Sequence, residues 1–198
     1  MFLNTNKFKQ LLKRAYKGTG FTLGSIDGAG IFVHGGYWMI WFERSVMPNR
    51  TKAAIIEFSG TLPEDGEIFK VREGDPNQYE IDQRKAFDVR SQWKDAKNPL
   101  KRLPVILSHY QTDICLYQDK YGRISAADAL AEKIQSTREL DEQEGSIMGP
   151  CTCDRPMGTI FWATDRCVLG IYPVALTQGR LHEAIKALET YDFFAEEV

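Results

Sequence analysis

Four cysteines and three histidines are the side chains best suited to catalysis or metal binding. Cys151 and Cys153 are separated by one residue, a tighter step than zinc-binding cysteine pairs usually have, and no second pair follows. A thiolate metal site completed by Cys167, and by Cys115 or a histidine, is therefore a weaker interpretation than a loop pair beside buried single cysteines. We predict no bound metal and no cofactor.

The histidines, His34, His109 and His182, lie far apart in the sequence and outside any recognisable nucleophile motif. A Cys–His or Ser–His pair can still assemble in space, because such partners need not be close in sequence. The glycines between residues 18 and 36 form no phosphate-binding loop, since no Gly-Lys-Ser/Thr element follows them. Hairpin turns explain these glycines better. From the histidines, cysteines and glycines together, we predict no catalytic residue.

The composition limits the classes of function. With 25 Lys and Arg against 27 Asp and Glu in 198 residues, the net charge is -2, which argues against a polycationic nucleic-acid binder and leaves only local clusters of charge. No stretch approaches the roughly 20 apolar residues that span a bilayer, and the first residues lack the apolar run of a secretory signal. Together with the sparse cysteines, these features predict a cytoplasmic protein that is not embedded in a membrane.

The densest basic run of the chain lies on its first predicted helix. Apolar residues recur at three- and four-residue steps between Phe8 and Tyr16, ahead of Gly18, so we expect a helix with one face in the core. No acidic residue lies between Lys7 and Lys17 to neutralise the other face. That face carries Lys7, Lys9, Lys13, Arg14 and Lys17.

Three short β runs follow, and glycines mark the turns between them. Asp27-Gly28 and Gly35-Gly36 supply the positive φ angles that tight hairpins need. The third run holds Tyr37, Trp38 and Trp41. Such rings can stack on bases, but alternation along a strand places them on both faces, which favours a strand buried on both sides or an interface strand. The three runs are 21–26, 31–34 and 37–42.

The same order of elements recurs three times: strand, short turn, strand, polar cap and helix. Asn49 is the expected cap of the first such helix, and Ser125 is the expected cap of the second, with Asp128 in its first turn. Units of this kind cover one sheet face with one helix, so the pattern predicts an α+β fold of antiparallel sheets. True internal duplication and the ordinary hairpins of an α+β protein both remain open. The units span residues 31–60, 105–134 and 159–188.

A polar stretch of mixed charge, residues 72–102, separates the first unit from the other two. We interpret it as the connection between two α+β halves, 1–90 and 91–198, which can also form one continuous domain. An acidic segment at 139–145 is expected to be a loop.

Two segments resemble the DNA sliding clamps, the ring-forming processivity factors of replicative polymerases. In the first half, the basic helix, the hairpins and the passage from Met47-Pro48 through Leu62-Pro63-Glu64-Asp65-Gly66-Glu67-Ile68 look like part of a clamp domain. In the second half, the run Ile160-Phe161-Trp162-Ala163-Thr164-Asp165-Arg166 is similar to a clamp hairpin written around Ala-Thr-Asp. The chain is shorter than ordinary clamps, and its second half has no obvious counterpart of the basic helix.

The resemblance implies a non-enzymatic accessory protein that associates with DNA through a clamp-like scaffold. Clamp-like rings place helices toward DNA, where Lys and Arg contact phosphates without reading bases. Ordinary solvated helix faces are the alternative interpretation of the same charges. The residues expected to contact DNA are Lys7, Lys9, Lys13, Arg14, Lys17, Arg50 and Lys52.

A second hypothesis is a protein-interaction module, an adaptor or inhibitor carried by a bacterial mobile element. Its contact surface would be the aromatic strand with Tyr37, Trp38 and Trp41, or the acidic segment. Under either hypothesis, free sheet edges would allow the chain to form a homo-oligomer.

Overall fold

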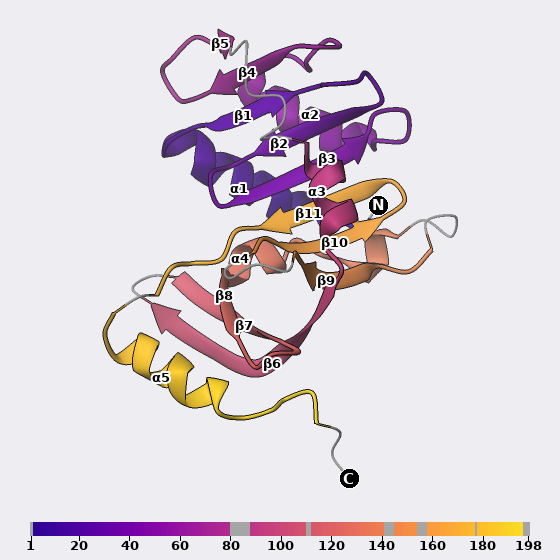
Figure 1. The fold of residues 1–198 in the computed structure, drawn as a ribbon. Helices are drawn as coiled ribbons and strands as arrows, with labels where there is room; N and C mark the ends of the chain where they lie inside the picture. Colours follow the sequence, from indigo (N-terminus) through magenta and orange to yellow (C-terminus); the bar gives the residue numbers. More distant parts are fainter. Residues whose placement is uncertain are drawn as a thin grey trace.

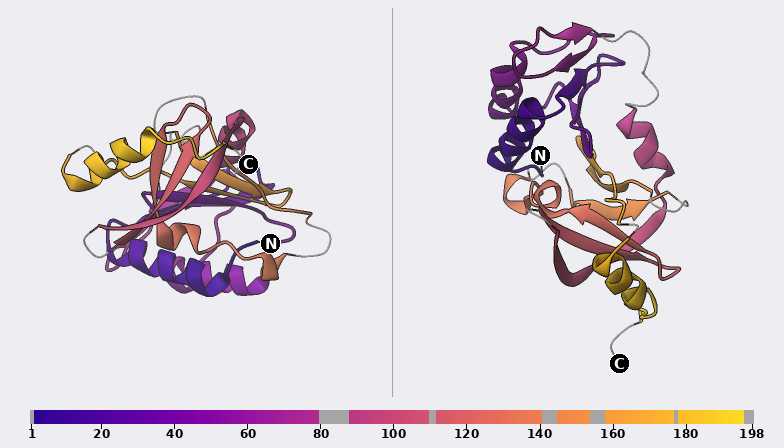
Figure 2. Two further views of the ribbon diagram at one scale, coloured as in Figure 1. Left: turned by 90° about the horizontal axis from the view of Figure 1, so that it is seen from below. Right: turned by 90° about the vertical axis from the view of Figure 1, so that its left-hand side faces the viewer.

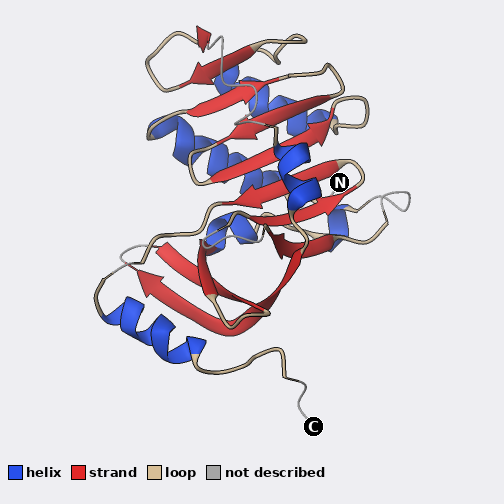
Figure 3. Cartoon of the chain, in the orientation of Figure 1, coloured by secondary structure: helices blue, strands red, loops and turns tan. Residues whose placement is uncertain are grey.

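The computed structural model describes residues 2–79, 88–109, 112–140, 145–153, 158–176 and 178–195. Over these residues the protein has an α+β fold, in which eleven strands form one antiparallel sheet accompanied by five α-helices (Figures 1 and 3). The predicted fold class is therefore confirmed. None of the described helices is long and apolar enough to cross a bilayer.

The helices differ widely in length. They are α1 (Thr5–Lys17), α2 (Asn49–Ser59), α3 (Val89–Asp95), α4 (Ala129–Glu132) and α5 (Arg180–Glu189). The strands of the first half are β1 (Phe21–Gly24), β2 (Gly30–His34), β3 (Trp38–Glu43), β4 (Ile68–Val71) and β5 (Gln78–Tyr79). The remaining strands are β6 (Asn98–His109), β7 (Thr112–Asp119), β8 (Ile124–Asp128), β9 (Met148–Thr152), β10 (Ile160–Thr164) and β11 (Cys167–Ile171).

Local signals account for the first helix and the first three strands. The side chain of Asn4 caps α1 by accepting a hydrogen bond from the backbone N–H of Lys7 at 3.1 Å. Gly28 and Gly36 adopt φ angles of 66° and 87° in the turns that join β1, β2 and β3. The predicted helix and hairpins are confirmed here. The apolar stripe of α1 that faces the core consists of Phe8, Leu11, Leu12 and Ala15.

Helix α2 also forms where it is predicted, but its expected cap is wrong. Asn49 is the first helical residue, and Pro48 occupies the cap position without a side-chain hydrogen bond. A fixed proline φ angle suits the entry to a helix, so the backbone alone starts this one. At the other end Gly60, with a φ angle of 77°, terminates the helix as expected.

The second predicted cap, Ser125, is a larger error. Residues Ile124–Asp128 form strand β8, which pairs with β7 so that Ala127 lies opposite Cys115. Asp128 is the true cap, because its Oδ1 accepts hydrogen bonds from the N–H groups of Leu130 and Ala131 at 2.8 and 3.4 Å. Pairing with a buried strand outweighed the local cap pattern, and α4 is reduced to a single turn.

Strand β3 has a separate apolar core on each of its faces. Trp38, Ile40 and Phe42 pack into the core beneath α1 and α2, whereas Met39 and Trp41 pack into a smaller core beneath α3. Figure 2 shows α1 and α2 on one side of the sheet and α3 on the other. The interpretation of this strand as buried on both sides is confirmed.

The sheet runs without a break through both predicted halves. β3 pairs with β11 along its length, with Ile40 opposite Leu169. Farther along, β6 pairs with β9 only at Asn98 and Pro99 before it turns away with β7 and β8, and these three strands form the lower end of the sheet in Figure 1. The last hairpin of the chain therefore lies at the centre of the sheet.

The predicted strand–strand–helix order is present in the first and third units, as β2–β3–α2 and β10–β11–α5. The prediction is wrong for the second unit, where three strands, β6, β7 and β8, precede the single turn of α4. The third unit differs in packing, because α5 lies on β8 rather than on its own hairpin. Ile185 of α5 packs with Ala126 of β8, and the backbone N–H of Ile124 donates to the Glu189 carboxylate at 3.3 Å.

The polar stretch 72–102 is more structured than a simple connection. It contains β5, α3 and the start of β6. Val89 is buried, and the ring of Trp93 packs edge-on against Phe161 with centroids 6.4 Å apart. Residues 80–87 of this stretch, and residues 141–144 of the predicted acidic loop, lie outside the described residues.

Candidate functional site

Helices α1 and α2 lie side by side and carry charge of nearly one sign. The rings of Tyr16 on α1 and Phe58 on α2 are 5.3 Å apart, which fixes the contact between the two helices (Figure 2). The only acidic residue in either helix is Glu57. We call this surface the basic helix face. Its cations are Lys7, Lys9, Lys13, Arg14, Lys17, Arg50 and Lys52.

Three of these cations form a stripe along α1. Lys9, Lys13 and Lys17 follow one another at four-residue steps, and all three are exposed. Residues four apart are neighbours on a helix surface, so their ammonium groups extend from the same side. That these lysines contact DNA stays a prediction. Of the cations expected to share this surface, Lys9 and Arg14 each pair with a carboxylate.

Lys9 is partly neutralised by a carboxylate. Its ammonium lies 2.5 Å from Glu57 Oε2, and the two side chains are 46% and 50% exposed. An ion pair in such a solvated position contributes only about 0 to 1 kcal/mol. A phosphate group can therefore compete for Lys9 at low energetic cost.

Arg14 is held more firmly. Its Nη1 lies 3.3 Å from Oδ2 of Asp128, its Nη2 donates to Thr112 Oγ1 at 3.4 Å, and its guanidinium lies 5.6 Å from the ring centroid of Tyr37. The Asp128 side chain is only 6% exposed, and the same carboxylate caps α4. Arg14 therefore ties α1 to the second half of the chain, a role that the sequence did not reveal.

The start of α2 adds further positive charge to the basic helix face. Arg50 is exposed and Lys52 is half-buried, and the first turn of α2 has no acidic residue. The N-terminus of a helix carries a partial positive charge. Both predicted residues therefore lie where an anion is favoured.

The aromatic strand does not offer its indole rings to a partner. Trp38 is fully buried, with its ring edge-on to Phe8 at 6.2 Å, and Trp41 is 7% exposed. Tyr37 is half-buried, and burial, followed by the charge of Asp128, raises its pKa to about 12. A protein partner at these three positions stays a prediction, and two of the three side chains belong to the core.

The cysteines and histidines are dispersed over the fold. Within the described ranges, no three His, Cys, Asp or Glu side chains converge in a way that could hold a metal ion. His34, His109 and His182 belong to β2, β6 and α5. Burial raises the pKa of Cys167 and of Cys151, so neither thiol is activated as a nucleophile.

One polar cluster was missed by sequence reasoning. Arg102 donates from Nε to Glu132 Oε1 and from Nη2 to Cys115 Sγ, both at 2.9 Å, and lies 5.7 Å from the ring centroid of Tyr117. Burial raises the pKa of Cys115 to about 12, which keeps it a thiol. Arg102 and Glu132 are 30 residues apart, so no local pattern could have paired them. The cluster joins β6 and β7 to α4.

Comparison of the chain with family models, curated proteins and solved structures finds no match. Function must therefore be inferred from the residues themselves.

Proposed function

We propose that this protein is a non-enzymatic accessory protein that associates with DNA, with the basic helix face against the phosphate backbone. The observation that carries this proposal is the segregation of charge. Seven of the 25 Lys and Arg residues of the chain lie on α1 and α2, but only one of its 27 Asp and Glu residues does. A nearly neutral chain thus presents a strongly cationic surface to a polyanion.

The side chains on this face suit phosphates better than bases. Lys9, Lys13 and Lys17 are flexible point charges, which neutralise phosphates without the planar geometry that reads a base edge. The binding should therefore be independent of DNA sequence and should weaken as salt is added.

The layering of the fold supports a clamp-like scaffold. α1 and α2 cover one face of an antiparallel sheet that continues from the first half into the second through β3 and β11. A sheet backed by cationic helices is the arrangement by which clamp-like rings present helices to DNA. Closure by sheet edges would need a second chain, and the mass of the protein in solution tests that part of the proposal.

The decisive experiment reverses the charge of the three lysines that form the stripe on α1. The variant Lys9→Glu/Lys13→Glu/Lys17→Glu should lose its affinity for a short labelled duplex, measured by fluorescence anisotropy over a range of salt concentrations. Each lost phosphate contact lowers the slope of log K against log salt by about 0.9, so the wild-type slope should exceed that of the variant by roughly 3. Wild-type protein that binds no DNA at low salt would refute the proposal.

A matched control tests whether the loss of affinity comes from the basic helix face or from the change in net charge. Lys97, Lys101 and Lys120 are exposed and lie outside α1 and α2. Their triple substitution with glutamate changes the net charge by the same amount, and it should leave most of the DNA affinity in place. Equal losses in the two variants would mean that the helices have no special role.

The protein-interaction hypothesis predicts a different pattern. A module of that kind would capture a specific protein and show no affinity for nucleic acid. Trp38 and Trp41 are buried, so Tyr37, which is half-buried, is the most accessible of the three predicted contact residues. Residues 141–144 of the acidic segment lie outside the described residues.

A further inference from the structure

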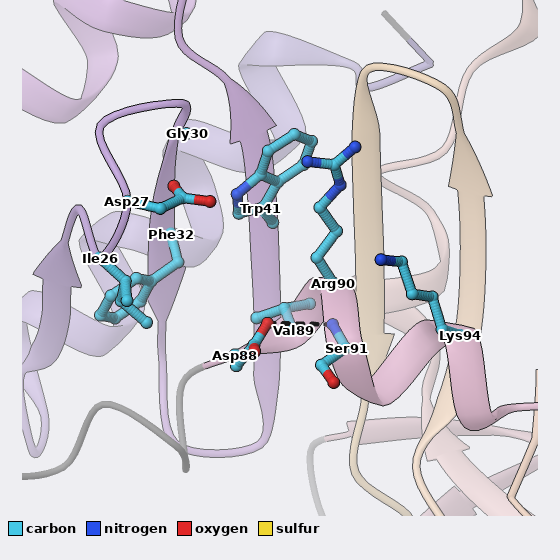
Figure 4. Close-up of a pocket in the computed structure, with 10 residues that line it drawn as sticks. All are labelled: Ile26, Asp27, Gly30, Phe32, Trp41, Asp88, Val89, Arg90, Ser91 and Lys94. Atoms are coloured by element: carbon cyan, nitrogen blue, oxygen red, sulfur yellow. Dashed lines mark hydrogen bonds between the residues drawn. The ribbon is translucent and has the colours of Figure 1, made fainter.

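A hollow of about 300 Å³ lies on the sheet face opposite α1 and α2, between α3 and the loop that joins β1 to β2 (Figure 4). This volume is at the lower end of the range for small-molecule pockets. Neither the predicted DNA contacts nor the predicted protein contacts, apart from Trp41, belong to it. Except at Trp41, the hollow is therefore separate from both predicted contact surfaces.

The indole ring of Trp41 forms one wall of the hollow. The ring fills the space that a side chain at residue 30 would need, because a Cβ built on Gly30 would collide with it. The guanidinium of Arg90 lies 4.7 Å from the centroid of the same ring. A neighbouring hollow, lined by Glu43 and Arg44, also reaches Trp41 and Arg90, so Arg90 lies between the two. Gly30 and the guanidinium of Arg90 thus already pack against this indole.

Charges of opposite sign line different sides of the hollow. Arg90 and Lys94 are four residues apart on α3, and Figure 4 shows both on the side of β11. Asp27 lies on the opposite side, and Asp88 lies at the start of α3. Side chains of Ile26, Phe32 and Val89 supply the apolar part of the lining.

Each carboxylate has unused hydrogen-bonding capacity. Asp27 Oδ1 accepts from the N–H of Ala29 at 3.2 Å, and Asp88 Oδ1 accepts from the N–H of Ser91 at 2.9 Å. Both residues are exposed, and neither makes an ion pair with another described residue. A bound ammonium group can therefore pair with the second oxygen of either carboxylate without breaking a turn.

We propose that this hollow binds a small zwitterionic molecule with the size and chemistry of an apolar amino acid. Its carboxylate pairs with Arg90 and Lys94, its ammonium group pairs with Asp27, and its side chain lies against the apolar part of the lining. Nucleotides fit less well, because two carboxylates repel a phosphate. This site is separate from the basic helix face, so DNA binding neither requires it nor tests it.

Three ligands that differ by one charged group test the proposal. Binding of L-phenylalanine, phenethylamine and 3-phenylpropionate to the full chain is measured by isothermal titration calorimetry. L-Phenylalanine should bind about tenfold more tightly than either analogue, since each analogue lacks one whole charged group and therefore every contact that this group makes; tenfold corresponds to about 1.4 kcal/mol. No detectable binding of L-phenylalanine, equal binding of all three, or tighter binding of 5′-AMP would each overturn it.

Two variants test which residues pair with each charged group of the ligand. Arg90→Gln/Lys94→Gln should reduce the affinity for L-phenylalanine to the level of phenethylamine, and it should leave phenethylamine binding unchanged. Asp27→Asn should do the reverse and spare 3-phenylpropionate. Lys101→Gln, a control on β6, should bind all three ligands like the wild type. An unchanged preference for L-phenylalanine in the double variant, with a normal circular dichroism spectrum, would also overturn the proposal.

Discussion

The two faces of the sheet use the same strands but are covered very differently. On one face, α1 and α2 are thirteen and eleven residues long and close over Trp38 completely. On the other face, α3 has seven residues and leaves a hollow beside Trp41. A fully covered face offers only the outer surface of its helices for binding. A sparsely covered face keeps room for a ligand among its own side chains.

The charges follow the same division. The helices of the covered face carry almost only cations, as a surface for a large polyanion requires. Beside α3, two cations and two carboxylates lie around one small hollow, an arrangement that suits a small ligand with both charges. The alternation of side chains along β3 is what makes two such different faces possible.

The largest expected effect on stability tests how differently the helices cover the two faces of the sheet. Trp38→Ala should lower the free energy of unfolding by about 3 to 5 kcal/mol, because it opens a cavity in a closed core. Trp41→Ala should cost clearly less, because its ring already borders a hollow that water can enter. Urea denaturation of both variants measures the difference. Equal losses would mean that the two faces are packed alike.

The next effect concerns the ion pair between Arg102 on β6 and Glu132 on α4. Burial alone would raise the pKa of Glu132, but contacts with Cys115, Tyr117 and Arg102 hold it below its ordinary value of 4.5. A lowered folded-state pKa stabilises the protein above 4.5, and this contribution is lost as the pH falls below that value. Glu132→Gln should cost about 1.5 to 3 kcal/mol at neutral pH.

The pH dependence makes this prediction specific. The stability difference between wild type and Glu132→Gln should shrink as the pH is lowered through the acidic range, as followed by urea denaturation at several pH values. A difference that is constant with pH would show that the charge of Glu132 is not involved.

The smallest expected effect is a difference between the stability contributions of two cations of the basic helix face, Arg14 and Lys9. Arg14→Gln should cost about 1 to 2 kcal/mol, because it leaves the nearly buried Asp128 without its ion pair. Lys9→Gln should change stability by less than about 0.5 kcal/mol, since its partner Glu57 is well solvated. Thermal unfolding of both variants measures the contrast. A larger loss for Lys9→Gln would reverse the assignment of structural and surface roles.

Much of the first half follows from local patterns, and parts of the second half do not. α1 has a cap residue, a regular apolar period and a terminating glycine, and these signals act within a few residues of one another. Around Ser125 the chain offers two alternative caps in an apolar segment, and pairing with β7 decided between strand and helix. Local propensity is weak compared with the burial that β8 gains by pairing with β7, even though β8 lies at the edge of the sheet.

The residues of the candidate sites also divide into those that local patterns predicted and those that only the fold brought together. The sequence alone determined that the cations of the basic helix face lie on amphipathic helices, because periodicity and charge are both local properties. Only the tertiary structure brought Glu57 to Lys9 and Asp128 to Arg14, and only it placed Asp27 across a hollow from Arg90. Contacts between residues so distant along the chain depend on how the whole sheet is assembled, and no short pattern encodes that.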